Sequence, residues 1–208
     1  MKLKLEILFA FVIMMNFTFA QNTIKMTNNY GSENQDVQDL LNFENIFFDK
    51  LNFQSENLKG KFYEIVLDEF RNGKLVKTAT LFDGSEADIF KIDNDKLSLK
   101  FAFKLSDEKL KTFIIGKTIS GQGFYSKKYY SKLYNDENDY ALKNFFGMKK
   151  EINLDSNKKN PIFAIITPTI HEDGSGSYCE VAQSGIDPEK LGEKFKIPHY
   201  FLISIKFK

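Results

Sequence analysis

The sequence predicts an all-β protein: an antiparallel two-layer β-sandwich of about nine strands with one or two short helices. Three observations support this fold class. From about Glu44 onward, apolar residues recur with a period of two, as in half-buried strands. Turn-forming residues recur about every ten positions. Strand and helix patterns do not alternate, as a parallel sheet would require. A partly open β-barrel is the alternative arrangement.

Residues 1–20 have the layout of a secretory signal peptide. Two early lysines precede an apolar run from Ile7 to Met15, and the small residue Ala20 stands just before an expected cleavage site at Gln21. The run is shorter than the roughly 20 residues that span a bilayer, although an uncleaved anchor is an alternative. We expect an exported, periplasmic or extracellular protein with no stable membrane insertion after cleavage.

Residues 21–43 are rich in Asn, Gln, Thr and Ser, a composition that predicts a flexible, solvated tether. One short helix is expected within it, because Ser32 and Gln35 have the spacing of a capping box. The apolar residues that follow share one helical face: Val37, Leu40 and Leu41. The β-sandwich domain is then expected to span residues 44–208.

Two stretches show the strand pattern most clearly. In Lys96–Leu105 (KLSLKFAFKL), alternate residues from Leu97 are apolar, and the residues between them are lysine or small. The segment from His199 (HYFLISIKFK) alternates in the same way. Its inward face is expected to carry Phe201, Ile203, Ile205 and Phe207. A helix would scatter these residues around its circumference, so both stretches are predicted strands.

A β-hairpin is predicted around Asn72-Gly73, a pair that suits a two-residue turn with positive φ at both positions. Counting outward from the turn pairs Phe70 with Leu75 and Asp68 with Lys77. That register places opposite charges across from each other.

Turn residues divide the rest of the chain. Further strands are expected at residues 87–92, 110–119, 124–134, 162–170 and 178–183, and a long exposed loop at residues 153–160. A small helix is expected within residues 184–195, because Asp187 suits the N-cap and Pro188 the first helical position.

Composition excludes several classes of function. Lys and Arg number 29 against 28 Asp and Glu, and removal of residues 1–20 balances the charges, so no global basic field attracts nucleic acid. Arg71 is the sole arginine, which rules out paired arginine forks around phosphate or carboxylate. The single cysteine, Cys179, cannot form an internal disulfide. No cofactor is expected, and stability is expected to come from packing of the 22 phenylalanines.

The stretch Ile170–Ser184 (IHEDGSGSYCEVAQS) concentrates reactive groups, and three chemistries can be compared there. An EF-type calcium loop fails because its first and twelfth ligand positions are not carboxylates, although a looser calcium site around Glu172 and Asp173 is an alternative. A thiol site would need His171 or His199 beside Cys179, yet acidic neighbours oppose thiolate formation. A zinc site lacks a closely spaced ligand pair, so no metal is expected. The simplest interpretation is a glycine-rich hairpin loop.

The segment GFYSKKYYSKLY is the candidate ligand-binding surface. Aromatic rings that can stack on sugars interleave there with ammonium groups, at Tyr125, Lys127, Lys128, Tyr129 and Tyr130. The competing interpretation is an edge strand, since lysines on sheet edges prevent pairing with other chains and tyrosine favours strands.

Residues 135–140 (NDENDY) cluster three carboxylates, and paired carboxylates can cleave glycosides as acid and base. A solvated turn explains the same residues more simply. The sequence contains no Gly-x-Ser-x-Gly elbow, no phosphate-binding glycine loop and no His-Glu-x-x-His motif. No catalytic residue is therefore assigned.

The segments Gly174–Cys179 (GSGSYC) and Ile197–Phe207 (IPHYFLISIKF) resemble an uncharacterised family of small exported β-rich bacterial proteins. The resemblance covers residues 44–208. It implies an exported β-sandwich and implies no activity or functional residue.

These observations favour a non-enzymatic exported module of the bacterial envelope that binds a glycan, a peptide or a protein partner, or has a structural role. A secreted hydrolase with a carboxylate or thiol site is the alternative. A calcium-stabilised β module is the second alternative.

Overall fold

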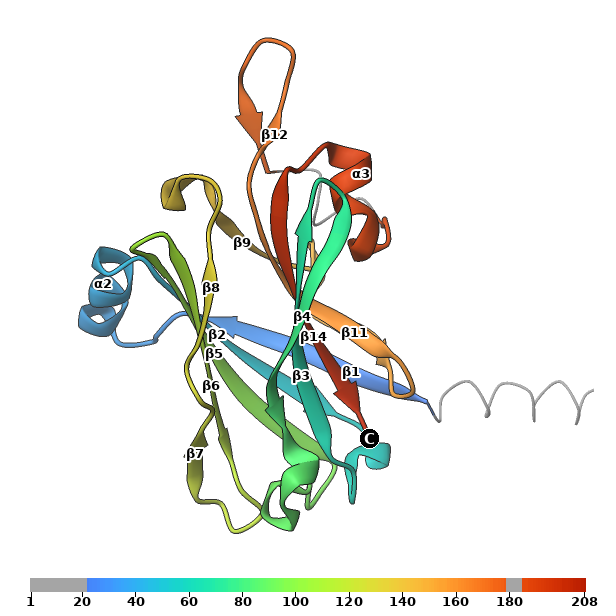
Figure 1. Cartoon of the computed structure of the whole chain (residues 1–208). Coiled ribbons are helices and arrows are strands. Elements are labelled where there is room, and N and C mark those ends of the chain that lie inside the picture. The colour runs from blue at the N-terminus through green and yellow to red at the C-terminus, as the bar shows by residue number, and fades with distance from the viewer. Residues whose placement is uncertain (1–21, 179–184) are drawn as a thin grey trace, which may run out of the picture.

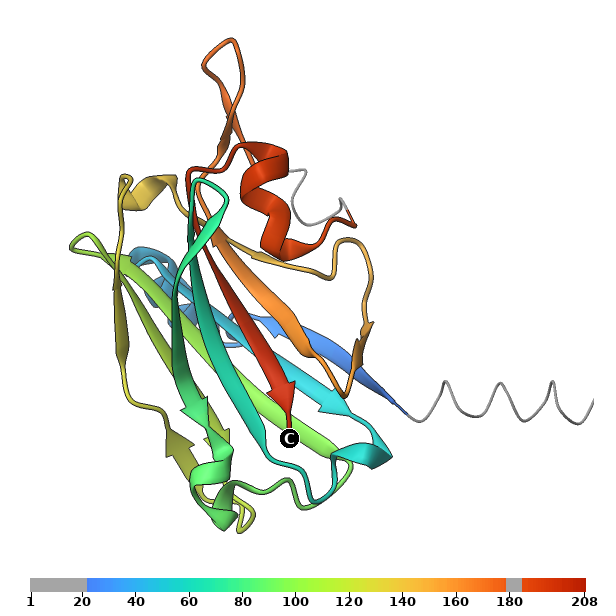
Figure 2. The ribbon, with the colours of Figure 1, turned by 45° about the vertical axis from the view of Figure 1, so that its right-hand side comes forward.

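The computed structural model describes residues 22–178 and 185–208. Two antiparallel sheets face each other and enclose the larger hydrophobic core, with no closed barrel, which confirms the predicted all-β sandwich (Figures 1 and 2). The predicted signal peptide and Cys179 lie outside the described residues, as does most of the strand expected at residues 178–183.

The larger sheet, called sheet A here, has the strand order β10-β1-β2-β5-β6-β7, and β8 pairs with β6 beside β7. Its strands are β1 (Thr23–Tyr30), β2 (Ile46–Gln54), β5 (Lys96–Ser106), β6 (Lys109–Lys117), β7 (Gly123–Tyr125), β8 (Tyr129–Lys132) and β10 (Ile152–Asp155).

The second sheet, sheet B, has the order β4-β3-β14-β11-β9. Its strands are β3 (Tyr63–Arg71), β4 (Lys74–Asp83), β9 (Ala141–Asn144), β11 (Lys159–Ile166) and β14 (His199–Phe207). A separate small hairpin, β12 (Thr169–Ile170) with β13 (Gly176–Ser177), projects from one end of the sandwich (Figure 1). The fourteen strands in the described residues exceed the predicted nine because several are only two to four residues long.

The helices are short. They are α2 (Gln35–Phe43) and α3 (Leu191–Phe195), with 3₁₀ turns η1 (Glu56–Leu58), η2 (Gly84–Glu86), η3 (Asp88–Phe90), η4 (Glu137–Asp139) and η5 (Pro188–Lys190). The predicted Asp187 cap is confirmed, since its carboxylate accepts a hydrogen bond from the Glu189 N–H at 3.1 Å. Among the described residues, no helix is both long and apolar enough to cross a membrane.

Side-chain alternation builds the core between the sheets, as predicted for β5. Leu99, Phe101 and Phe103 are at most 1% exposed, while the residues between them face outward. Phe163 of β11 meets the rings of Phe101 and Phe103 edge to face, at centroid distances of 5.3 and 5.4 Å. Edge-to-face packing is the arrangement that the ring quadrupoles prefer, so the two sheets are joined through aromatic contacts.

Strand β14 is buried on both faces, which its alternating pattern does not reveal. Phe201 and Ile203 point into the core between the sheets. Tyr200 and Leu202, on the opposite face, form a second apolar cluster with α3. Tyr200 also stacks on Phe70 at 4.6 Å. Sheet B therefore has its outer face partly covered, whereas the outer face of sheet A carries no covering helix over β5 and β6 (Figure 2).

The predicted β3–β4 hairpin is present, with a corrected register. Asn72 and Gly73 have φ values of 49° and 75°, as a two-residue hairpin turn of this type requires. Phe70 pairs with Leu75 as predicted, but the register shifts beyond this pair. Lys77 consequently lies opposite Glu69 instead of Asp68. A β-bulge inserts one residue into the pairing, and counting outward from a turn cannot detect it.

The predicted tether is wrong for residues 23–30, which form β1 between β2 and β10. Ile24 and Met26 are fully buried, and two such side chains anchor an otherwise polar strand. The sandwich therefore begins well before Glu44. The predicted helix is confirmed as α2, but Asn34 is its N-cap and accepts from the Val37 N–H at 3.1 Å.

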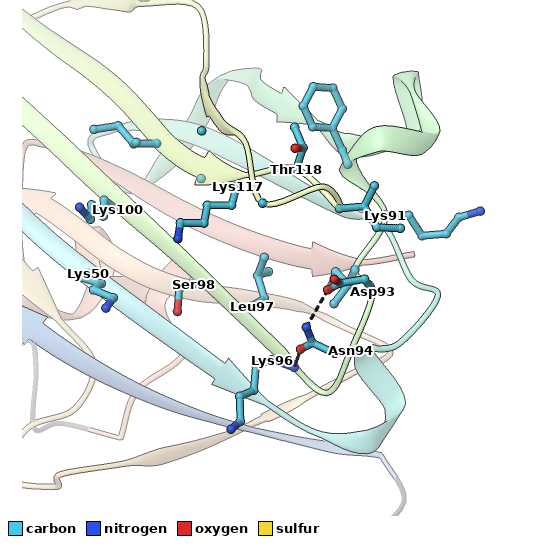
Figure 3. Close-up of a pocket in the computed structure, with 17 residues that line it drawn as sticks. Lys50, Lys91, Asp93, Asn94, Lys96, Leu97, Ser98, Lys100, Lys117 and Thr118 are labelled. Atoms are coloured by element: carbon cyan, nitrogen blue, oxygen red, sulfur yellow. Dashed lines mark hydrogen bonds between the residues drawn. The ribbon is translucent and has the colours of Figure 1, made fainter.

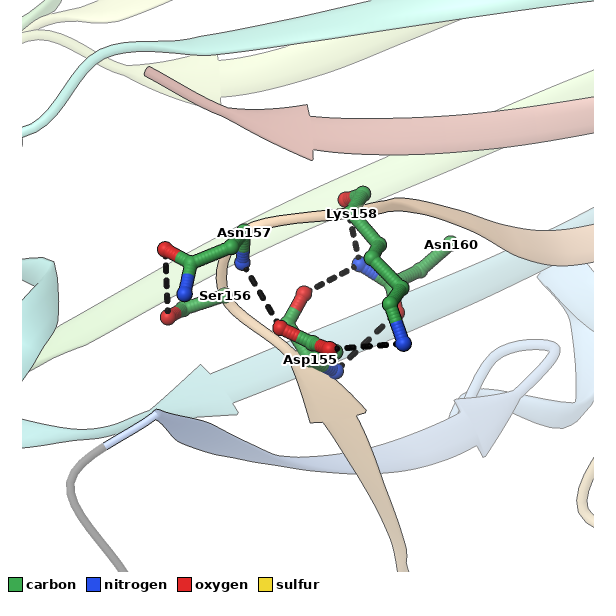
Figure 4. A network of polar contacts seen from close by, with 5 residues as sticks. All are labelled: Asp155, Ser156, Asn157, Lys158 and Asn160. Carbon is green, nitrogen blue, oxygen red and sulfur yellow. Dashed lines mark hydrogen bonds and ion pairs between the residues drawn. The ribbon is translucent and has the colours of Figure 1, made fainter. Parts of the chain in front are cut away.

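Three further expectations are corrected. Residues 88–90 form the 3₁₀ turn η3 rather than a strand, and residues 124–134 divide into β7 and β8. Residues 153–160 are not a long loop, because β10 and β11 flank a tight turn (Figure 4). There Asp155 accepts from the Asn157 N–H, and the amide of Asn160 bonds backbone groups on both sides of the turn.

Candidate functional site

The outer face of sheet A presents a row of side chains that crosses four strands. The register pairs Lys50 of β2 with Lys100 of β5, Lys100 with Ile115 of β6, and Ile115 with Tyr125 of β7. Side chains of directly paired residues lie on the same face of a sheet. Strand pairing thus brings two ammonium groups, one aliphatic side chain and one tyrosine into line.

A hollow of about 610 Å³ lies beside this row, between the open end of the β5–β6 hairpin and the loop that contains η3. Figure 3 shows four lysine side chains around Ser98: Lys50, Lys96, Lys100 and Lys117. We call this site the lysine hollow. Leu97 and Ile115 contribute apolar surface, and Gly121 and Gly123 leave one rim without side chains.

The charge of the lysine hollow is not neutralised within the described residues. None of its four lysines forms an ion pair there, whereas Lys104 on the same face pairs with Glu44. A fifth lining lysine, Lys91, is paired with Asp88 at 3.2 Å. The only carboxylate in the lining, Asp93, accepts a hydrogen bond from the neighbouring Asn94 amide at 2.7 Å. Ammonium groups of like sign gathered in this way attract an anion.

Neutral polar groups extend the site across the sheet. Ser98 Oγ donates to Asn52 Oδ1 at 2.7 Å, and Asn52 Nδ2 donates to Asn29 Oδ1 at 3.1 Å. These three residues come from β5, β2 and β1. Each also has hydrogen-bonding capacity that this chain of contacts does not use. The same face can therefore hold hydroxyl or amide groups next to its charges.

The sequence-predicted tyrosine–lysine segment does not form one surface. Tyr125 and Tyr130 face outward and are 68% and 53% exposed, while Tyr129 turns inward against the core. Lys127 and Lys128 are exposed in the connection between β7 and β8. The expected edge position is confirmed, since β7 and β8 lie at the edge of sheet A. Of the five predicted residues, Tyr125 alone pairs with a residue that lines the lysine hollow.

Sequence reasoning missed the lysine hollow because its lining comes from three stretches that are distant in sequence: Lys50, residues 90–100 and residues 115–123. One signal was present: Lys96 and Lys100 alternate with buried leucines, so both must face solvent on the same side of β5. The contributions of Lys50 and Lys117 depend on cross-strand register. That register cannot be read from either strand alone.

The glycine-rich segment forms the β12–β13 hairpin, which is exposed at its tip. Asp173 accepts from both the N–H and the hydroxyl of Ser175, at 2.9 and 2.7 Å. These bonds lower the pKa of Asp173, so its carboxylate has a local structural role. His171 Nε2 lies 2.9 Å from Ser177 Oγ. No group of three or more His, Cys, Asp or Glu residues suited to a metal occurs among the described residues.

A second hollow, of about 620 Å³, lies at the opposite end of the β5–β6 hairpin and contains carboxylates predicted as a solvated turn. We call it the carboxylate hollow, after Glu108, Asp136 and Glu137. Asp136 caps η4 by accepting from the Asn138 N–H at 2.9 Å, and Glu137 accepts from the Glu108 N–H at 3.3 Å. The carboxylates of Asp136 and Glu137 are thus engaged with nearby backbone.

His199, considered as a partner for the thiol, is 1% exposed and packed within a polar cluster. Its Nδ1 is hydrogen-bonded to the hydroxyl of Tyr140, and its Nε2 lies 3.4 Å from Glu69. Burial and the nearby Arg71 lower the pKa of His199 to about 4. The imidazole is therefore neutral at pH 7, and its contact with Glu69 is not an ion pair.

Comparisons with known proteins do not assign the chain to a family. No family model, no curated protein and no solved structure matches it. The resemblance to exported β-rich bacterial proteins stays a prediction.

Proposed function

We propose that this protein is an exported, non-enzymatic module of the bacterial envelope that binds an anionic glycan in the lysine hollow. One observation carries the proposal: four lysines from three strands surround one hollow without a neutralising carboxylate partner in the described residues. The export component is supported by the signal-peptide pattern in residues 1–20.

The lining of the lysine hollow favours binding over catalysis. It contains one carboxylate, Asp93, and neither histidine nor cysteine. General acid–base and nucleophilic reactions use these groups in cooperating sets. A glycosidase that uses paired carboxylates would require a second carboxylate close to Asp93, and the lining contains none. The residues beside it are instead Asn94 and lysines, which suit hydrogen bonds and charge attraction.

A glycan fits this surface better than other polyanions. The net formal charge of the whole chain is only +1, so the positive field is local, whereas nucleic-acid-binding domains are commonly basic overall. Asn52 and Ser98 add hydrogen-bonding groups beside the charges, and sugar hydroxyls can use them. Tyr125 adds an exposed ring next to the lining residue Ile115. Charge, amides and an aromatic ring together match an acidic carbohydrate.

The proposal is tested by calorimetric titration of the chain from residue 21 with acidic oligosaccharides. The variant Lys100→Glu/Lys117→Glu is expected to bind about tenfold more weakly or worse, since each lysine near an anionic surface contributes about 1 kcal/mol. The matched control, Lys74→Glu/Lys190→Glu, makes the same charge change at exposed positions outside the lysine hollow. It is expected to bind like the parent.

Two outcomes would overturn the proposal. Equal weakening by both double variants would mean that net charge, and not the lysine hollow, governs binding. Tighter binding to phosphatidylglycerol vesicles or to single-stranded DNA than to every acidic oligosaccharide would point to a membrane or nucleic-acid partner.

A further inference from the structure

We propose that the ligand is an acidic polysaccharide whose chain runs across the strands of sheet A, with a sugar ring on Tyr125 and its acid groups at Lys100 and Lys50. This inference rests on the proposed function and specifies its ligand. It adds Tyr125 as a residue that recognises the sugar ring itself.

The direction of the chain follows from the register. Lys50, Lys100, Ile115 and Tyr125 occupy successive positions perpendicular to the strands. Neighbouring strands lie about 4.8 Å apart, so the row extends over roughly 14 Å from Lys50 to Tyr125. A small inorganic anion contacts only part of such a row, whereas a short oligosaccharide can follow all of it.

Tyr125 is a preformed platform. Its ring stacks on Phe113 of β6 with a centroid distance of 5.6 Å and an interplanar angle of 6°. The side chain nevertheless remains 68% exposed. Stacking on a neighbour restricts the ring before a ligand arrives, which lowers the entropy cost of binding. Its exposed surface is available for the C–H face of a sugar.

The lysines are spaced for repeated charges. Lys96 and Lys100 lie on the same strand four residues apart, roughly 13 Å at the rise of an extended chain. Lys50 and Lys117 lie on the strands on either side of β5. The lining contains no arginine, so it lacks the planar fork that binds a single phosphate or carboxylate through two parallel hydrogen bonds. Ammonium groups carried by three strands can each contact an acid group on one of several sugar units.

A second line of groups reinforces this direction. The hydrogen-bonded side chains of Ser98, Asn52 and Asn29 cross β5, β2 and β1 beside the lysines. Their mutual bonds hold them in place, and each has donor or acceptor capacity beyond these bonds. The surface thus offers charges and hydrogen bonds along one direction, as recognition of a charged, hydroxylated chain requires.

The experiment compares four probes: oligogalacturonides of increasing length, sulfated chondroitin oligosaccharides of matched length, linear polyphosphate and neutral dextran. Binding of either acidic oligosaccharide, rising in affinity over the first few sugar units, supports the inference. Tyr125→Ala is expected to weaken that binding about tenfold, the scale of one lost ring-stacking contact, and to leave any polyphosphate binding unchanged. Tyr125→Phe should retain the oligosaccharide affinity.

Tyr130→Ala is the matched control, since Tyr130 is a similarly exposed outward tyrosine that pairs with Lys111 away from the lysine hollow. Thermal melting shows whether each variant is folded. If acidic sugars bind, but affinity does not rise beyond one unit and Tyr125→Ala has no effect, the polysaccharide inference is overturned while the proposed function stands. Polyphosphate binding as tight as that of the acidic oligosaccharides also overturns it. If no acidic glycan binds, the proposed function itself fails.

Discussion

The two ends of the β5–β6 hairpin carry hollows of similar volume and opposite charge. At the turn end, Asp136 and Glu137 accept hydrogen bonds from backbone N–H groups, so their charges help hold the local structure. At the open end, Lys100 and Lys117 have no carboxylate partner within the described residues. Charged groups that are hydrogen-bonded to the backbone stabilise the fold. Charged groups left without such partners are available to a ligand, and this difference supports the proposal that the lysine hollow is the binding site.

The largest expected effect is on the pH dependence of stability, and it comes from two buried groups, Asp49 and His199. Their contribution must be known before any pH dependence is assigned to the charges of the two hollows. Burial raises the pKa of Asp49 to about 6, from an ordinary value of 3.8. The folded chain therefore keeps a proton that the unfolded chain releases, and stability falls as pH rises from about 4 to 6. The lowered pKa of His199 acts in the opposite sense, because its contribution is lost as pH falls from 6.5 to about 4.

Asp49→Asn separates these opposing effects. Between pH 4 and pH 6, the free energy of unfolding of this variant should rise relative to the parent by about 2 kcal/mol. Urea denaturation at unit pH steps measures the difference. A difference that does not change with pH would show that Asp49 is not protonated in the folded protein. Binding at the lysine hollow is best compared above pH 7, where neither group changes its charge.

Salt dependence sharpens the comparison between the two ends. Salt screens exposed charges over about 8 Å at physiological ionic strength. The affinity for an acidic oligosaccharide should therefore fall several-fold when the salt concentration rises from about 50 to about 300 mM. Glu137→Gln, at the carboxylate hollow, should leave this salt dependence unchanged. Lys100→Gln should reduce it, because one ammonium group no longer contributes. Titration calorimetry at four or so salt concentrations tests this, and an equal response of the two variants would contradict a localised site.

The smallest expected effect is the change in the free energy of unfolding when single residues of the two hollows are replaced. Asp136→Ala should lower the free energy of unfolding by about 1 kcal/mol, since the cap of η4 is lost. Lys100→Ala should change it by less than about 0.5 kcal/mol, as is usual for exposed side chains without partners. Chemical denaturation of both variants provides the measurement. A larger loss of unfolding free energy for Lys100→Ala than for Asp136→Ala would show that Lys100 also has a structural role, which contradicts the difference drawn between the two hollows.

Local sequence patterns predict the elements whose structure is determined locally. The alternation in β5 and the Asn72-Gly73 turn both appear as expected, because side-chain period and backbone φ are properties of short segments. β1 was missed since Thr and Asn dominate it, and its two deeply buried side chains, Ile24 and Met26, matter only once β2 and β10 are beside it. The polar composition of a segment predicts that it is solvated, but whether its few apolar side chains are buried depends on the strands beside it.

The lysine hollow was only partly predictable for the same reason. The outward direction of Lys100 follows from its own strand, and the exposed position of Tyr125 agrees with an edge strand. Their alignment through Ile115 depends on pairing across β5, β6 and β7. One inserted residue would shift this register and change which side chains lie side by side, as the bulge in the β3–β4 hairpin changes the partner of Lys77.

The central place of β14 has a consequence for how the molecule assembles. β14 pairs with β3 and β11, yet it is synthesised after every other described strand. Without β14, the β3–β4 and β9–β11 pairs have no strand that joins them, and the edges of β3 and β11 lack their partner. Pairing over such long sequence separations slows folding, and unpaired edges are where chains associate wrongly. Shielding of those edges by a chaperone during synthesis would therefore increase the yield of native protein.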